Sequence, residues 1–164
     1  MSVAKITYLC CFALIFFQIN AAHAQETITI TEITQLDFSK LDIPASGSQT
    51  IIINPSSGGY SGSGTVQSGS PARGEYKIIL SGTGSSTSIT IDIQNISSGS
   101  AQLTVDQFTG DYGGTFINSF PRSGLTKPVT SPGTTLYLGA TAQYSSGVSE
   151  GNLVPSFDIV VTLQ

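Results

Sequence analysis

The sequence has few of the side chains on which most catalytic and metal sites depend. It contains two cysteines, one histidine, one methionine and no tryptophan. Both cysteines (Cys10 and Cys11) and the histidine (His23) lie within the first 24 residues. Without that segment the chain has no thiol and no imidazole, so it lacks the bases of Ser-His-Asp and Cys-His relays and the usual zinc and copper ligands. We therefore expect a protein that is not an enzyme and that uses no cofactor and no metal.

The first 24 residues have the pattern of a secretory signal peptide. Lys5 supplies a positive charge, a mostly apolar run follows from Ile6 to Ile19, and Ala22-His23-Ala24 ends the segment with small residues. The apolar run is shorter than the about 20 residues of a membrane-spanning helix. We expect a helical signal peptide over residues 1–24, cleavage between Ala24 and Gln25, and no transmembrane segment in the mature chain, residues 25–164.

Charge is also scarce, since Asp, Glu, Lys and Arg make up only 10% of the sequence, against about a quarter in typical domains. The formal net charge of −4 becomes −5 when Lys5 leaves with the leader. The five remaining basic residues are scattered, so they form no patch for phosphates, and we expect no nucleic-acid partner.

The mature region is instead rich in apolar residues that alternate with polar ones, the period of a β-strand with one buried face. The clearest example is Ser88 to Gln94, where Ile89, Ile91 and Ile93 share one face. The same period runs through residues 27–34, 75–80, 136–144 and 157–163, and shorter runs lie at 50–53, 103–108 and 115–120. Glycine- and serine-rich turns separate these runs, and no helical period appears. The pattern predicts an all-β fold, a single antiparallel β-sandwich of immunoglobulin-like or jelly-roll-like type over residues 25–164.

The run from Thr27 to Thr34 starts close to the expected cleavage site. It is β-branched, contains no proline or glycine, and has a single charge at Glu32. Such a strand can pair within its own sheet or with an exposed edge of a neighbouring molecule. Ile28, Ile30 and Ile33 are therefore candidate contacts for strand exchange, and the sequence leaves both alternatives open.

Two further sets of residues are candidate contact sites. Tyr60 and Tyr112 lie in or beside Gly/Ser loops, where their rings would either stack on a ligand or fill the ends of the sandwich. Asp106 and Asp111 bracket a predicted glycine-rich turn, residues 107–114, and would offer oxygens to calcium. The ligand spacing of a calcium loop is absent, so the alternative is two solvated acids at a strand end.

Several segments resemble the opening and the later strands of the bacterial DUF4402 family. These segments are residues 36–39 (LDFS), 46–55 (SGSQTIIINP), 57–59 (SGG), 75–82 (EYKIILSG), 136–140 (LYLGA) and 157–162 (FDIVVT). Members of this family are exported proteins of Gram-negative type bacteria, similar in outline to pilin-like and spore-coat-U-like surface subunits. The resemblance implies a location in the periplasm or at the cell surface, and it brings no catalytic residues.

Together these features predict an exported, non-enzymatic surface or envelope protein. The first hypothesis is a pilin-like structural or adhesive subunit that acts by β-strand pairing with copies of itself or with a periplasmic chaperone or other assembly partner. The alternative is a secreted β-sandwich module that binds a glycan or a small ligand through its loops.

Overall fold

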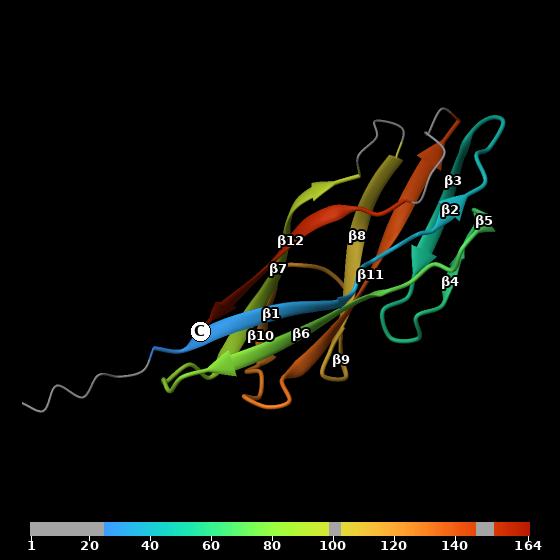
Figure 1. The fold of residues 1–164 in the computed structure, drawn as a ribbon. Helices are drawn as coiled ribbons and strands as arrows, with labels where there is room; N and C mark the ends of the chain where they lie inside the picture. Colours follow the sequence, from blue (N-terminus) through green and yellow to red (C-terminus); the bar gives the residue numbers. More distant parts are fainter. Residues whose placement is uncertain (1–24, 99–102, 147–152) are drawn as a thin grey trace, which may run out of the picture.

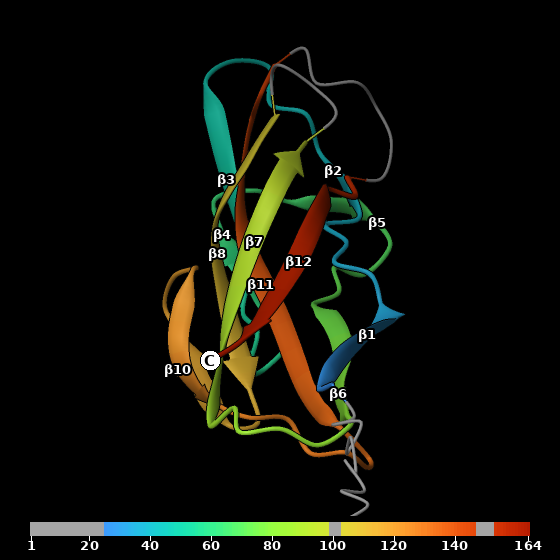
Figure 2. The ribbon, with the colours of Figure 1, turned by 90° about the vertical axis from the view of Figure 1, so that its left-hand side faces the viewer.

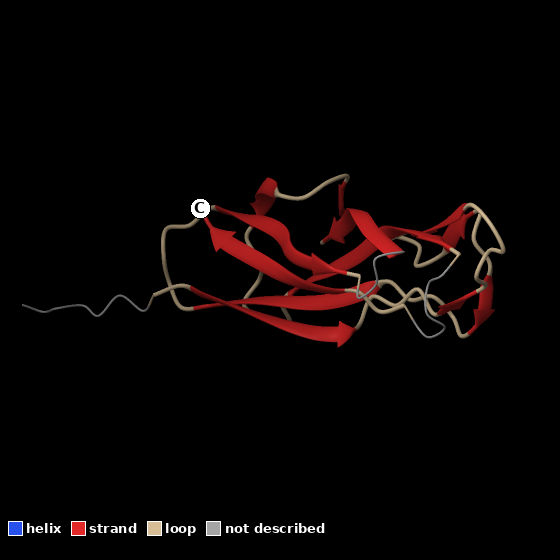
Figure 3. Cartoon of the chain, turned by 90° about the horizontal axis from the view of Figure 1, so that it is seen from above, coloured by secondary structure: helices blue, strands red, loops and turns tan. Residues whose placement is uncertain are grey.

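The computed structural model describes residues 25–98, 103–146 and 153–164, and the predicted leader and its cleavage site at Ala24 lie outside or at the border of these ranges. The described chain consists of strands and the loops between them (Figure 3). Among the described residues, no helix is long and apolar enough to cross a membrane. The strands are β1 (Thr27–Thr34), β2 (Lys40–Leu41), β3 (Ser48–Ile53), β4 (Tyr60–Gly62), β5 (Val66–Ser68), β6 (Gly74–Ser81), β7 (Ser88–Ser97), β8 (Leu103–Tyr112), β9 (Thr115–Ile117), β10 (Arg122–Thr126), β11 (Thr134–Ser145) and β12 (Ser156–Leu163).

The strands form a β-sandwich, as the alternating pattern predicts. A seven-stranded antiparallel sheet runs in the order β1-β6-β11-β3-β4, with β8 and β9 attached along the other side of β11. A three-stranded sheet, β10-β7-β12, packs against it (Figures 1 and 2). The short strands β2 and β5 pair separately.

The core lies between these sheets and is made by the alternating residues that the sequence singled out. Ile89, Ile91 and Ile93 of β7 are buried against the larger sheet. The larger sheet contributes Tyr76, Ile78 and Leu80 from β6 and Leu136, Leu138, Ala140, Ala142 and Tyr144 from β11, all of them buried. The prediction of one buried face per strand is confirmed for these three strands.

Strand β11 is the centre of the larger sheet because it pairs with two different strands along one edge. Its first part, Thr134–Leu138, pairs with β6, and its second part, Thr141–Ser145, pairs with β3. Strand β8 covers the other edge over nearly the whole length. Gly139 lies at the change of neighbour, where a Cβ atom would stand 2.1 Å from the carbonyl oxygen of Ile53. Glycine is thus required where the end of β3 crosses close to β11.

Candidate functional site

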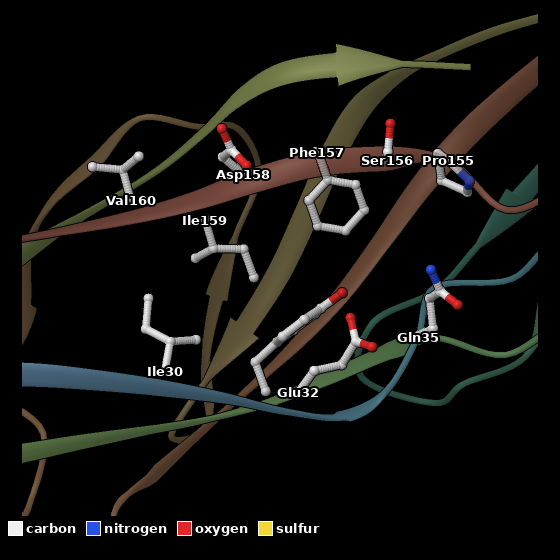
Figure 4. A pocket seen from close by; sticks show the side chains of 10 residues that line it. Ile30, Glu32, Gln35, Pro155, Ser156, Phe157, Asp158, Ile159 and Val160 are labelled. Atoms are coloured by element: carbon white, nitrogen blue, oxygen red, sulfur yellow. The ribbon is translucent and has the colours of Figure 1, made fainter. Parts of the chain in front are cut away.

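An open groove separates the two strands that stand at the edges of the two sheets, β1 and β12. The groove has a volume of about 530 Å³, within the range of about 300–1,000 Å³ typical of ligand pockets. Figure 4 shows Ile30 and Glu32 reaching into it from β1, and Phe157 and Ile159 from β12. Tyr76 of β6 also lines the groove, between the two strands.

Both strands that border the groove have one unpaired edge within the described ranges. Strand β1 pairs with β6 alone, through a register that runs from Thr27 opposite Ser81 to Thr34 opposite Glu75. Strand β12 pairs with β7 alone. Figure 1 shows β1 and β12 as the strands at these edges, and residues of both line the groove. Backbone N–H and C=O groups along such edges are available to pair with another extended segment.

The apolar residues of these two edge strands are only half-buried, unlike those of their inner neighbours. Ile28 and Ile30 of β1 are partly exposed, and so are Phe157, Ile159, Val161 and Leu163 of β12. The corresponding rows of β6 and β7 are buried. The core is therefore incompletely covered along this one side, and an added apolar row would remove more of it from water.

Aromatic rings form the wall of the groove beside Pro155. The ring of Phe157 meets Tyr76 edge-on at 6.2 Å and Phe108 at 5.2 Å between centroids, a favourable arrangement for aromatic pairs. Burial of the Tyr76 ring, followed by the nearby charge of Glu32, raises the pKa of its phenol above the ordinary value. Tyr76 therefore stays neutral at physiological pH, and its role here is packing and hydrogen bonding rather than proton transfer.

The polar groups of the groove carry negative charge. Glu32 and Asp158 are the ionisable carboxylates among its lining residues. Asp158 accepts a hydrogen bond from Asn95 Nδ2 at 2.5 Å, whereas Glu32 lies beside the Tyr76 hydroxyl. A segment that docks here therefore meets two carboxylates beside the apolar walls.

The N-terminal end of β1 is held by an ion pair. Lys127 Nζ donates to Glu26 Oε1 and, at 3.1 Å, to the carbonyl of Ser86. The backbone N–H of Ser86 donates to Glu26 Oε2 at 3.3 Å. The hydrogen bond from Lys127, with the further bonds from Ser86, lowers the pKa of the Glu26 carboxyl. These contacts join β1 to the loops that follow β6 and β10.

The structure places the three isoleucines predicted for strand exchange in two different positions. Ile28 and Ile30 lie on the inner face of β1, between Thr residues that are exposed. Ile33 is the extra residue of a bulge, because Glu32 pairs with Tyr76 and Thr34 with Glu75. Its side chain is 58% exposed. In this structure β1 pairs with β6 of its own chain, and Ile28 and Ile30 border the open groove.

The two candidate tyrosines differ from each other in exposure. Tyr60 in β4 is 51% exposed, so its ring is accessible. Tyr112 at the end of β8 is only 3% exposed, which agrees with the alternative that its ring fills the end of the sandwich and argues against a ring that stacks on a ligand. The strand period explains the difference, since Tyr112 falls on the inner row of β8 with Phe108 and Gly110.

Asp106 and Asp111 do not bracket a turn, contrary to the sequence prediction. Both belong to β8, and the turn to β9 is limited to Gly113 and Gly114. Five residues of extended chain separate them by about 16 Å, too far to share one calcium ion. Asp111 accepts hydrogen bonds from Ser56 Oγ and from the N–H of Gly114. Among the described residues, no three His, Cys, Asp or Glu side chains gather as a metal site.

The sequence did not reveal that β12 and β1 border a common groove. The alternation of β12 indicates an inner face but not which strand covers it, because pairing partners are set by the topology of the whole chain. Tyr76 lies within the predicted strand run at residues 75–80, whose pattern does not indicate a place beside a groove.

The search of curated proteins and the search of solved structures gave no match. The model of the family described as "Domain of unknown function (DUF4402)" matches residues 28–162, a range that begins in β1 and ends in β12 and so includes both borders of the groove. The chain therefore belongs to the DUF4402 family.

Proposed function

We propose that this chain is an exported, non-enzymatic surface or envelope subunit, pilin-like in its action, that assembles by β-strand pairing at the groove between β1 and β12. One observation carries the proposal: β1 and β12 each have one unpaired edge within the described ranges, and both strands line a groove of about 530 Å³ with half-buried apolar walls. Addition of an extended segment to exposed strand edges is a general mode of recognition, in which the backbone supplies affinity and alternate side chains supply specificity.

The partner segment that we propose is β1 of a second copy. Its alternation of Ile28 and Ile30 with threonines provides the apolar row that the groove lacks. Removal of the predicted leader after Ala24 would leave β1 two residues from a free N-terminus. The strand is also held on one edge only, by β6. A strand in this position can leave its own sheet and enter a neighbouring one without moving the rest of the fold.

The proposal is tested by strand complementation. The chain from Gln25 to Gln164 contains every described strand, and a second version without residues 25–34 lacks β1. We expect a fluorescent peptide of residues 25–34 to bind the complete version, in which the groove is present, and to raise its melting temperature. The same peptide should also bind the truncated version, where it takes the place of β1 beside β6. The matched control is the same peptide with Ile28→Lys and Ile30→Lys. It keeps the threonines of the outer face but loses the apolar row of the inner face, so it should not bind. Failure of the wild-type peptide to bind would contradict the proposal.

Assembly of the undeleted chain gives an independent readout. Light scattering and electron microscopy should detect oligomers or fibres of the chain from Gln25, in a concentration-dependent manner. Ile159→Lys places a charge on the wall of the groove and should leave monomers, whereas Thr162→Lys puts the same charge on the exposed face of the same strand and should assemble normally. Both variants must first show cooperative melting. A chain that stays monomeric at every concentration tested would refute strand pairing.

A further inference from the structure

A second cavity, of about 580 Å³, lies away from the β1–β12 groove and shares none of its lining residues. Its walls come from β7, from the middle of β8 and from the chain between β9 and β10, with one residue each from β3 and β11. It therefore opens near β8 and β10 rather than beside β1. Its size lies within the range of small-molecule sites.

The middle of β8 is distorted where it lines this cavity. Thr109 pairs with Gly139 while Asp106 pairs with Thr141, so β8 has one residue more than β11 over this interval. Gln107, within the bulge, has a φ of 46°, a left-handed conformation that is uncommon for a residue other than glycine. Bulges of this kind redirect side chains and are frequent beside functional sites. All four residues from Asp106 to Thr109 line the cavity.

The bulge leaves one carboxylate oxygen in an unusual position. Asp106 Oδ1 is buried and has no hydrogen-bond partner among the described residues. A buried acceptor without a donor is unfavourable, whereas a donor supplied by a ligand would satisfy it. Asp106 is also the only ionisable side chain in the lining of the cavity. The charge of the site is thus that of one carboxylate, which disfavours phosphates and other anions.

The rest of the lining combines neutral polar groups with apolar surface. Gln107, Asn118, Ser119 and Thr141 provide amide and hydroxyl groups, and Phe108 and Phe120 provide aromatic surface. Neutral hydrogen-bonding groups around an apolar wall suit a ligand that has hydroxyl groups at its rim and an apolar face. A saccharide ring has this distribution of groups.

We infer that this cavity is a binding site for a neutral saccharide unit, and that the Asp106 side chain rotates to accept a hydrogen bond from a sugar hydroxyl, because Oδ1 is closed to solvent in its present position. Asn118 and Ser119 are exposed and stand at the mouth, where they contact further hydroxyls. The site differs from the loop tyrosines that the sequence suggested for a glycan, since neither Tyr60 nor Tyr112 lines it. It also functions independently of strand pairing.

The test is a chemical-shift titration of the ¹⁵N-labelled chain from Gln25 to Gln164. The probes are glucose, galactose, mannose, N-acetylglucosamine and their β-linked disaccharides, with glucuronate, lysine and calcium chloride as charged comparisons. We expect at least one neutral sugar to shift the amides of residues 106–109, 118–120 and 141. Asp106→Asn should lower the affinity for that sugar about tenfold or more, because the hydrogen bond loses its charged acceptor. Asp42→Asn removes the same charge from an exposed site and should bind as the unchanged chain does.

A second substitution distinguishes a loss of sugar binding from a folding defect. Asn118 is exposed, so Asn118→Ala should leave the melting temperature unchanged while it lowers the affinity for the sugar severalfold. The inference is overturned if no neutral sugar shifts these amides, or if Asp106→Asn binds the sugar unchanged. It is also overturned if glucuronate, lysine or calcium binds there in preference to every neutral sugar.

Discussion

Substitution of Gly139 by alanine tests the crossing of β3 and β11 at the centre of the larger sheet. The added Cβ would stand 2.1 Å from the carbonyl oxygen of Ile53, 2.9 Å from Pro55 Cδ and 3.0 Å from Pro55 N. The nearest of these atoms belongs to the backbone, so no side-chain rotation can make room for the methyl group. The end of β3 must instead move away from β11 by about 1 Å to restore ordinary contact distances.

The expected loss of unfolding free energy is about 3 kcal/mol. Overpacking of a well-packed interior costs about 1–3 kcal/mol, and the upper end applies because backbone must shift and because Pro55 is itself fully buried. Alanine has less conformational entropy than glycine in the unfolded chain, and this difference offsets about 0.4–1 kcal/mol of the steric cost of the added methyl group. For a domain of this size, a net loss of that magnitude lowers the melting temperature by roughly 10–15 °C.

The assay is thermal and urea unfolding followed by circular dichroism, with Gly59→Ala as the control. At Gly59 an added Cβ would meet only Ser57 Oγ, at 3.4 Å, so the change in unfolding free energy should stay within about 0.5 kcal/mol. If Gly139→Ala melts within about 3–5 °C (about 1 kcal/mol) of the unchanged chain, the close approach of the two strands is not required and the reasoning is wrong.

Three further outcomes follow from single contacts and from the burial of single side chains. Tyr144→Phe removes the hydrogen bond from the hydroxyl to Gln49 Oε1, 2.9 Å long, and should cost about 1 kcal/mol in urea unfolding; an unchanged midpoint would contradict this. The pKa of Glu26 is lowered in the folded chain from its ordinary value of 4.5, so its contribution to stability is present above that pH and lost as the pH falls through the lower, folded value. Unfolding monitored from pH 7 to pH 2 should show this loss, and Glu26→Gln should show less of it; identical pH profiles would refute the role of the Lys127 pair. Ile33→Ser, at a side chain 58% exposed, should change stability by less than about 0.5 kcal/mol, whereas Ile78→Ala, fully buried, should cost about 2–5 kcal/mol by the same unfolding measurement.

Alternation of apolar residues was sufficient to predict the long strands and their inner faces. Ile89, Ile91 and Ile93 are buried as expected, and so are the inner residues of β6 and β11. Short strand β9 lies in the predicted run at residues 115–120, but β2, β4, β5 and β10 escaped prediction because two, three or five residues carry too little of the period. Tyr60–Gly62 is an example, since it lies in a Gly/Ser-rich stretch and pairs with β3 only through the fold.

The candidate sites were less predictable because they depend on which strands become neighbours. Ile28 and Ile30 were singled out correctly as inner residues of an N-terminal strand, yet nothing in their spacing indicates the unpaired edge of β12 across the groove. Asp106 shows the same limit. Its bulge arises from a register shift against Gly139 and Thr141, some thirty residues away in the sequence, and so the buried, unpartnered oxygen has no local signal.

The central place of β11 has a consequence for the order in which the chain folds. Strands β3, β6 and β8 join one sheet only through residues 134–145. Before those residues are available, β3–β4 and β8–β9 are isolated hairpins, which are at best marginally stable in water. Such dependence on contacts between distant segments slows folding. The chain should therefore stay largely extended until its last third has been made, a property that would suit passage through a narrow translocation channel if the protein is exported as we propose.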